Sequence, residues 1–242
     1  MKCPGQDSRY WKPGAIFEVR CPKCKNIVEF FKDDTTRKCN RCGYRFVNPK
    51  MDFGCASYCE HAEQCLGTLP EELLALKENL FKDRVAVEVK RYFKSDFKRI
   101  GHAGRVARHA ERIGKLEGGN LAVILCAAYL HDIGIPEAER KFQSAAPEYQ
   151  EQEGPPIARS ILSKLKAKES VIQEVCDIIA HHHHPKCDET LNFKVVYDAD
   201  QIANLEERLK DMPMEKGRLK ETIAATFLTE SGKHTAEAVL LV

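Results

Sequence analysis

Residues 121–139 read LAVILCAAYLHDIGIPEAE, and this stretch decides the fold. The ten consecutive apolar residues 121–130 predict a buried helix. The segment runs directly into His131 and Asp132. An imidazole and a carboxylate at the end of a buried segment are costly unless something pairs with them, and a metal ion would do so.

Further imidazoles and carboxylates lie on both sides of this pair. His102 lies upstream in RIGHAGRVARHAERI, and the histidine run at 181–184 and Asp200 in VVYDADQIANLEE lie downstream. A lone inward histidine is more often a packed core residue than a ligand, and an aspartate in DAD can simply cap a helix. Several such groups on separate helices of one bundle, however, would be buried unpaired unless a cation collected them.

The order H, HD, H, D resembles the HD-domain superfamily of metal-dependent phosphohydrolases. The first histidine is then His102, the doublet is His131-Asp132 within HDIG, and the last acid is Asp200. The resemblance implies an all-α HD-domain helical bundle in which these four residues hold a divalent metal, with Asp198 just outside the ligands. Such donors suit manganese, iron, magnesium or cobalt, and zinc is also compatible with them.

Helical patterns fill the chain from about residue 69 to its end. Thr68 is positioned to cap a helix and Pro70 falls in its first turn. We therefore expect the helical hydrolase domain to span residues 69–242. The resemblance to the superfamily covers roughly residues 95–205 of it.

Composition describes a soluble chain without a dominant charge. The 242 residues carry a net charge of +2, and 31% of them are charged, so no global attraction to nucleic acid or membrane is expected. No uninterrupted apolar stretch reaches the roughly 18 to 20 residues of a membrane span, and MKCPGQDSRYW lacks a signal-peptide core. We expect a cytoplasmic protein with no membrane partner.

Cysteine is concentrated at the N-terminus. Eight of the eleven cysteines fall within the first 65 residues. In a cytosolic chain, clustered cysteines are more often metal ligands than disulfides. Residues 1–68 are therefore expected to form a small cysteine-rich, metal-binding module.

The first cysteine group has the spacing of a zinc ribbon. Cys21 and Cys24 form one CxxC pair, and Cys39 and Cys42 form another, with fourteen residues between the pairs. Two such pairs can surround a tetrahedral zinc ion. The β-type residues 27–31 and the polar turn after them predict a β-hairpin between the pairs.

A second group, Cys55, Cys59 and Cys65, supplies three thiolates without a local fourth. Cys3 could complete this set, with His61 as a substitute. The irregular spacing fits either a [4Fe–4S] cluster or a second zinc ion, and buried structural cysteines are the alternative. The aromatic and basic residues of the module could also dock nucleic acid or protein, although a purely structural role explains them equally.

The histidine run is where a second ion could bind. In the dinuclear branch of the superfamily, histidines after an aliphatic helix hold a second metal or the phosphate. The resemblance assigns this role to His181 and His182, with Glu153 or Glu151 in the place of an upstream ligand that is often histidine. His183 and His184 are then expected to be solvated or to lie just outside the ligands. The alternative is that the whole run forms a polar surface loop before Pro185.

Cations are needed for the substrate phosphate. A lysine often follows HDIG in these enzymes, but Ile135 stands here. We expect Arg105, Lys141 or Arg159 to supply the charge, and Arg105 in particular, because it shares a helix face with His102.

The remaining roles concern water and protons. In the reaction that the resemblance implies, Asp132 orients a metal-activated water, and His181 or Glu137 acts as general acid or base. The predicted substrate is a small phosphorylated molecule such as a nucleotide. Two alternatives stay open: a di-iron HD-type oxygenase, and a non-catalytic nucleotide sensor that docks through its zinc ribbon.

Overall fold

The computed structural model describes residues 16–31, 34, 36–50 and 71–241, and the side chains of all of these except 71–80. The chain divides into two compact units, Met1–Asn79 and Leu80–Val242. The domain boundary predicted from sequence falls after residue 68, and this division falls after residue 79. The predicted second cysteine group, namely Cys3, Cys55, Cys59 and Cys65, lies outside the described residues.

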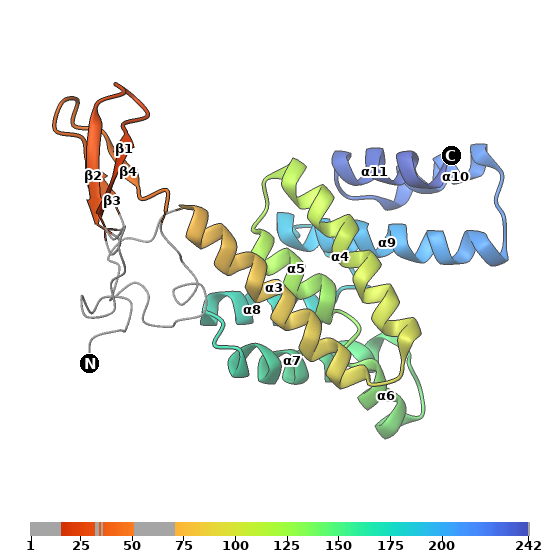
Figure 1. The fold of residues 1–242 in the computed structure, drawn as a ribbon. Coiled ribbons are helices and arrows are strands. Elements are labelled where there is room, and N and C mark those ends of the chain that lie inside the picture. Colours follow the sequence, from red (N-terminus) through yellow and green to blue (C-terminus); the bar gives the residue numbers. More distant parts are fainter. Residues whose placement is uncertain (1–15, 32–33, 35, 51–70, 242) are drawn as a thin grey trace. The chain divides into compact units, whose positions relative to one another are not determined.

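The first unit contains two short antiparallel pairs of strands (Figure 1). Strand β1, Ile16–Arg20, pairs with β2, Ile27–Phe31, and β3, Thr36–Lys38, pairs with β4, Arg45–Val47. The predicted strand at 27–31 is confirmed, but its hairpin partner precedes the first CxxC pair instead of following it. Each CxxC pair therefore lies in the turn of its own hairpin.

The turn after β2 separates the two hairpins. The Asp34 carboxylate accepts hydrogen bonds from the Phe31 backbone N–H at 2.7 Å and from Arg37 Nε at 2.6 Å. These bonds hold the chain in a bend, so β3 pairs with β4 and not with β2. Buried Phe30 and Phe46 meet edge to face with ring centroids 5.3 Å apart and form the small core between the hairpins.

The second unit is an all-α bundle, as predicted (Figure 1). Its helices are α3 Glu71–Phe93, which begins in the first unit, α4 Phe97–Glu117, α5 Leu121–Leu130, α6 Ile135–Phe142, α7 Pro147–Lys164, α8 Glu169–Ile179, α9 Leu191–Asp211, α10 Lys216–Thr226 and α11 Glu230–Leu240. The chain is helical almost throughout this unit because apolar residues recur at helical spacing and turns are short.

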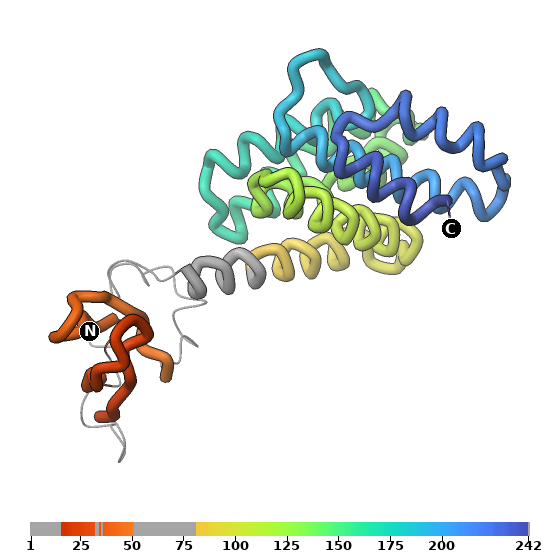
Figure 2. The backbone as a smooth tube through the Cα atoms, turned by 90° about the horizontal axis from the view of Figure 1, so that it is seen from above, coloured from red at the N-terminus to blue at the C-terminus, as the bar shows by residue number. Residues whose placement is uncertain are grey.

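Helices α4, α5 and α9 form the centre of the bundle. Buried α5 packs against both α4 and α9, and α11 covers α9 along the side seen in Figure 2. Side-chain caps fix where the central helices begin: Asp96 accepts from the Arg99 N–H, and Asn120 accepts from the N–H groups of the first turn of α5. Gly118, at φ 80°, ends α4 in the left-handed conformation.

The segment Leu121–Phe142 is long and apolar enough to cross a membrane by length and composition alone, although no uninterrupted apolar run in it is that long. It consists of α5, a turn and α6, and 67% of its most apolar window is buried inside the bundle. Its hydrophobicity is therefore that of a core segment.

The turn between α5 and α6 contains a close backbone crossing. A Cβ atom on Gly134 would lie 2.3 Å from the Gln150 carbonyl oxygen and 2.6 Å from the Gly154 nitrogen. Only glycine fits at this position, because α7 passes directly beside the turn. The crossing fixes the turn that carries His131 and Asp132.

Candidate metal centre

Three buried side chains from distant parts of the chain meet at the centre of the bundle. His102 comes from α4, His131 directly follows α5, and Asp200 comes from α9. The Asp200 Oδ1 atom lies 3.0 Å from His102 Nε2 and 3.4 Å from His131 Nε2. One ligand atom from each residue lies within 4.8 Å of the others, a spacing that one metal ion could span.

The two histidines that face Asp132 have their tautomers fixed by the backbone. His131 Nδ1 lies 3.0 Å from the Ala128 carbonyl oxygen, and His182 Nδ1 lies 2.9 Å from that of Ile179. Since a carbonyl only accepts, Nδ1 carries a proton in each ring, and Nε2 is the ring atom that remains to bind an ion. Both Nε2 atoms are buried without a hydrogen-bond partner among the described residues, which fits metal ligation.

Asp132 lies between this cluster and a second one. Its Oδ2 atom is 3.3 Å from His131 Nε2, and its Oδ1 atom is 3.8 Å from His182 Nε2. With His182 and His183, Asp132 forms a further group whose ligand atoms all lie within 4.8 Å of one another. One carboxylate therefore has an oxygen for each of two neighbouring sites.

The histidine run is divided differently from the sequence expectation. His181 turns away, its Nε2 lies 3.0 Å from Glu189, and its ring stacks on Phe193. His183, expected to be solvated or just outside the ligands, lies in the second group instead. Helix α8 ends at Ile179, so the histidines follow turn geometry, in which helical spacing no longer predicts the side-chain directions.

The acids expected to complete the second site have other partners. Glu153 lies 2.7 Å from Lys141 Nζ, and Glu151 accepts hydrogen bonds from the His183 backbone N–H and the His184 ring. Glu153 belongs to neither ligand group. The second group thus gains His183 in place of His181 and Glu153.

The expected general acid Glu137 is also paired. It binds Arg140 through two hydrogen bonds and lies 3.4 Å from Lys141. The hydrogen bonds to Arg140 lower the pKa of Glu137 to about 2, so it is ionised at neutral pH and has no proton to donate.

The three expected phosphate-binding cations are not free. Arg105 pairs with Glu207, Lys141 pairs with Glu153, and Arg159 pairs with Glu169 at 2.7 Å. Lys141 and Arg159 do not line the cavity beside the cluster. Arg105 instead helps to position His102, because its partner Glu207 also accepts a hydrogen bond from the His102 ring.

Asp198 has a structural role. It accepts hydrogen bonds from the backbone N–H groups of Leu228 and Thr229 and from the Thr229 hydroxyl. Burial raises the pKa of Asp198 to about 6 despite these bonds. It joins α9 to the start of α11 and does not face the ligands.

The charged side chains of the cluster shift one another's pKa values. Burial disfavours the charged form of His131, but the carboxylates of Asp132 and Asp200 outweigh it and raise its pKa well above the ordinary value. Burial likewise opposes ionisation of Asp132, yet His131 and His182 hold its pKa well below the usual range. The site is therefore built to keep carboxylates charged in a buried place, as cation ligands must be.

A cavity of about 260 Å³ opens beside the cluster. Its lining comprises Asp96, Lys98, Arg99, His102, Asp132, Ile135, Asn204 and Glu207. Sequence reasoning missed Lys98, Arg99, Asn204 and Glu207. A signal for the last two was present, because they follow Asp200 by four and seven residues and so share its helix face.

Two of these residues orient the ligands. Asn204 Nδ2 donates to Asp200 Oδ2 at 2.9 Å, which leaves Oδ1 directed at the histidines. Glu207 Oε1 lies 3.1 Å from His102 Nδ1, so this carboxylate accepts the Nδ1 hydrogen bond and holds the ring with Nε2 directed at Asp200 Oδ1.

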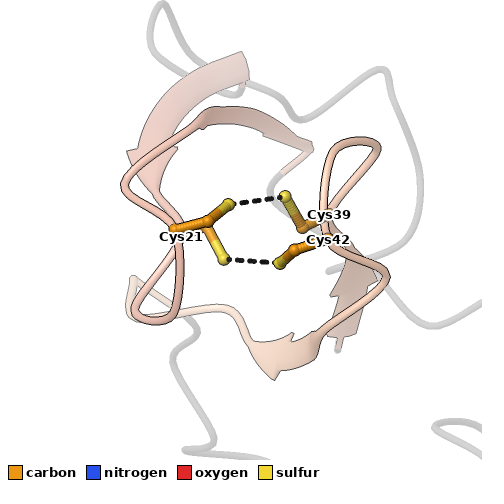
Figure 3. Close-up of side chains that lie close together, drawn as sticks. Cys21, Cys39 and Cys42 are labelled. Carbon is orange, nitrogen blue, oxygen red and sulfur yellow. Dashed lines mark hydrogen bonds between the residues drawn. The ribbon is translucent and has the colours of Figure 1, made fainter.

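The cysteine site in the first unit is a separate centre (Figure 3). Cys21 Sγ lies 3.6 Å from Cys42 Sγ, and Cys24 Sγ lies 3.5 Å from Cys39 Sγ. All four sulfurs lie within 4.8 Å of one another, so they could hold one ion, as predicted.

The two CxxC turns have the same geometry. Lys25 and Gly43 both have positive φ, at 61° and 72°, and each donates its N–H to the first cysteine of its pair, at 2.9 Å from the carbonyl of Cys21 and Cys39 respectively. Gly43 suits this conformation, whereas Lys25 adopts it at a steric cost that a bound ion would offset.

The thiols also differ in acidity. The backbone N–H of Cys42 lowers the pKa of Cys39 to about 6. Despite a hydrogen bond from the Asn26 backbone, burial and the neighbouring sulfurs raise the pKa of Cys24 to about 12. Four adjacent thiolates repel one another without a cation, so the donor set fits a divalent metal.

Comparison with known proteins gives one family match and several similar solved structures. A family model of the HD domain matches residues 99–205, and no curated protein matches the chain. One similar solved structure is a predicted HD superfamily hydrolase from an uncultured Thermotogales bacterium, with 26% identity over 64% of this chain and 82% of that one, at a TM-score of 0.49. A second is YpgQ of Bacillus subtilis, with 19% identity over 67% of this chain and 89% of that one. A third is an HD-superfamily hydrolase from Bacillus thuringiensis, with 21% identity over 67% of this chain and 90% of that one. Both have a TM-score of 0.47. The matched range contains His102, the HDIG turn and Asp200 on the helices that bring them together, and it is these residues, 99–205, that match the HD-domain family.

Proposed function

We propose that this protein is a metal-dependent phosphohydrolase that acts on a small phosphate ester, with a nucleotide as the expected substrate class. The observation that carries the proposal is the buried group of His102, His131 and Asp200, completed by Asp132 and open to a cavity. The buried Nε2 atom of His131 has no hydrogen-bond partner among the described residues, which supports metal ligation, since an unsatisfied buried polar atom is otherwise costly.

A divalent ion held by these four residues would supply Lewis acidity, polarising a phosphoryl oxygen and lowering the pKa of water. The chain supplies the orientation. The Ala128 carbonyl, Asn204 and Glu207 fix His131, Asp200 and His102, so the donor atoms converge without rearrangement. Preorganised ligands of this kind lower the cost of reaching the reactive geometry.

The protonation states favour acceptor roles around the cluster. Asp132, with its lowered pKa, stays a carboxylate and can orient a water molecule through a hydrogen bond. Burial and the neighbouring His182 lower the pKa of His183 to about 4, so this ring is neutral at pH 7 and can serve as a ligand. The group of Asp132, His182 and His183 supports a second ion beside the first.

The cysteine group supports a structural zinc ion in the first unit. Four thiolates in two CxxC turns are a closed donor set, which suits a structural site. An ion there would stabilise a module whose described core contains few side chains.

The test is phosphate release by the full-length protein. After chelation and dialysis, it is assayed with manganese, magnesium or cobalt against nucleoside mono-, di- and triphosphates and simple phosphomonoesters. We expect hydrolysis of at least one substrate that needs added metal and is lost in Asp132→Asn. The matched control is Asp188→Asn, an exposed aspartate outside both ligand groups. Tight nucleotide binding without product, or equal activity in Asp132→Asn, would refute the proposal.

A further inference from the structure

Two cations occupy an electrostatically unfavourable position at the mouth of the cavity. Lys98 and Arg99 lie in the first turn of α4, which carries no acidic residue. The N-terminus of a helix is its positive end and favours anions. Both residues nevertheless line the cavity together with His102 and Asp132.

The charge of Arg99 is compensated within the protein. Its Nη1 lies 2.8 Å from Asp96, which also caps α4, and its Nη2 lies 2.5 Å from Glu139 of α6. Arg99 thereby ties the start of α4 to α6 and has two carboxylates as partners.

Lys98 has no such compensation. It is exposed and makes no ion pair with any residue in the described part of the chain. Ile135, across the same lining, offers no charge, and the Asn204 amide is committed to Asp200. An anion entering the cavity therefore meets one uncommitted cation, at the positive end of a helix and beside the ligand cluster.

The carboxylate of Glu207, also in the lining, sets the direction of binding. It lies against His102 and Arg105 and would repel an anionic group placed next to it. The favourable place for a phosphate is thus the side formed by Lys98 and the first turn of α4.

We propose that Lys98 is a substrate-binding residue, whose ammonium group holds a non-bridging oxygen of the phosphate that faces Asp132. The proposal rests on the proposed function and deepens it, since it makes Lys98 the residue that selects phosphorylated over uncharged substrates. Arg105, paired with Glu207, does not take this role.

The test uses inorganic phosphate, the expected product, titrated calorimetrically into the manganese-loaded full-length protein. Lys98→Met weakens phosphate binding about tenfold, the order expected for losing one charge-assisted hydrogen bond. Lys98→Arg, which keeps the charge, binds within a few-fold of the original protein. Lys90→Met, which removes an exposed lysine of α3 outside the cavity, leaves the affinity unchanged.

Activity provides a second readout. For a phosphate ester, Lys98→Met raises KM more than it lowers kcat, because a binding contact is lost while the ligand cluster is intact. Unchanged phosphate affinity in Lys98→Met, or no phosphate binding by the original protein, would overturn the proposal for Lys98. Phosphate binding that depends on Lys98 without hydrolysis of any ester would instead refute the proposed function and leave the binding role supported.

Discussion

His131 and His182 are held by the same backbone contact. In each ring Nδ1 lies next to the carbonyl oxygen three residues earlier, at 3.0 Å for His131 and 2.9 Å for His182. Each Nε2 therefore faces Asp132, that of His131 toward Oδ2 and that of His182 toward Oδ1. This shared geometry is the main structural reason to expect two neighbouring ions instead of one.

The first prediction separates His182 from its neighbour in sequence. His182→Gln removes a ligand atom of the second group, so the protein should lose about one bound metal ion per chain. His181→Gln should keep the full complement, because His181 binds Glu189 and stacks on Phe193. Elemental analysis of both variants after loading with manganese checks this; equal metal content in the two would contradict the division of the histidine run.

The second prediction concerns the crossing at the HDIG turn. Gly134→Ala places a methyl group against the backbone of α7 and should lower the free energy of unfolding by about 1–3 kcal/mol, as overpacking does. Gly104→Ala is the matched control, since a Cβ there meets nothing within 4 Å and a helical alanine is favoured by up to about 1 kcal/mol. Urea unfolding of the two variants measures the difference, and equal stability would contradict the described crossing.

Sequence order was enough to predict which three side chains meet in the first buried group. His102, His131 and Asp200 are each preceded or followed by apolar residues at helical spacing, so their inward direction follows from the pattern that buries the helices. The all-α bundle followed from the same periodicity.

What lies beyond regular helices could not be predicted in this way. His183 reaches the second group because α8 ends at Ile179 and the chain turns, and side-chain directions in a turn depend on the packing around it. Glu153 is at the depth expected of a ligand but is paired with Lys141, and that ion pair depends on how α6 crosses α7. The spacing of residues along one helix does not show which side chains of another helix it will contact.

The third prediction concerns pH and the attachment of α3. A hydrogen bond from Lys115, opposed by partial burial, and another from Lys82 of α3 lower the pKa of Glu111 below its ordinary value. Because the pKa is lower in the folded protein, ionised Glu111 stabilises the fold above pH of about 4.5, and the contribution is lost as the pH falls through the lowered value.

Glu111→Gln should therefore lower the free energy of unfolding by less than about 1 kcal/mol at pH 7, since the carboxylate is partly exposed and its ion pairs are screened by solvent. The difference between the variant and the original protein should shrink as the pH falls below 4. Thermal unfolding across this range measures it, and a difference that grows in acid would contradict the assigned contacts.

The fourth prediction concerns the cysteine centre. Cys39→Ser should abolish zinc binding at the four-cysteine site and disorder β3 and β4, because each CxxC turn closes its own hairpin. The helical unit, which has its own core, should keep its helical circular dichroism signal. Amide resonances of residues 16–50 that stay dispersed in the variant would show that the hairpins do not depend on the metal.

The account depends most on His131 acting as a metal ligand through Nε2. The most direct measurement is calorimetric titration of manganese into the metal-free, full-length protein, comparing His131→Gln with His109→Gln, whose ring binds Glu206 outside the cluster. We predict that His131→Gln loses high-affinity manganese binding in the helical unit, by 10-fold or more, while His109→Gln binds as the original protein does. Unaltered manganese affinity in His131→Gln would contradict the account.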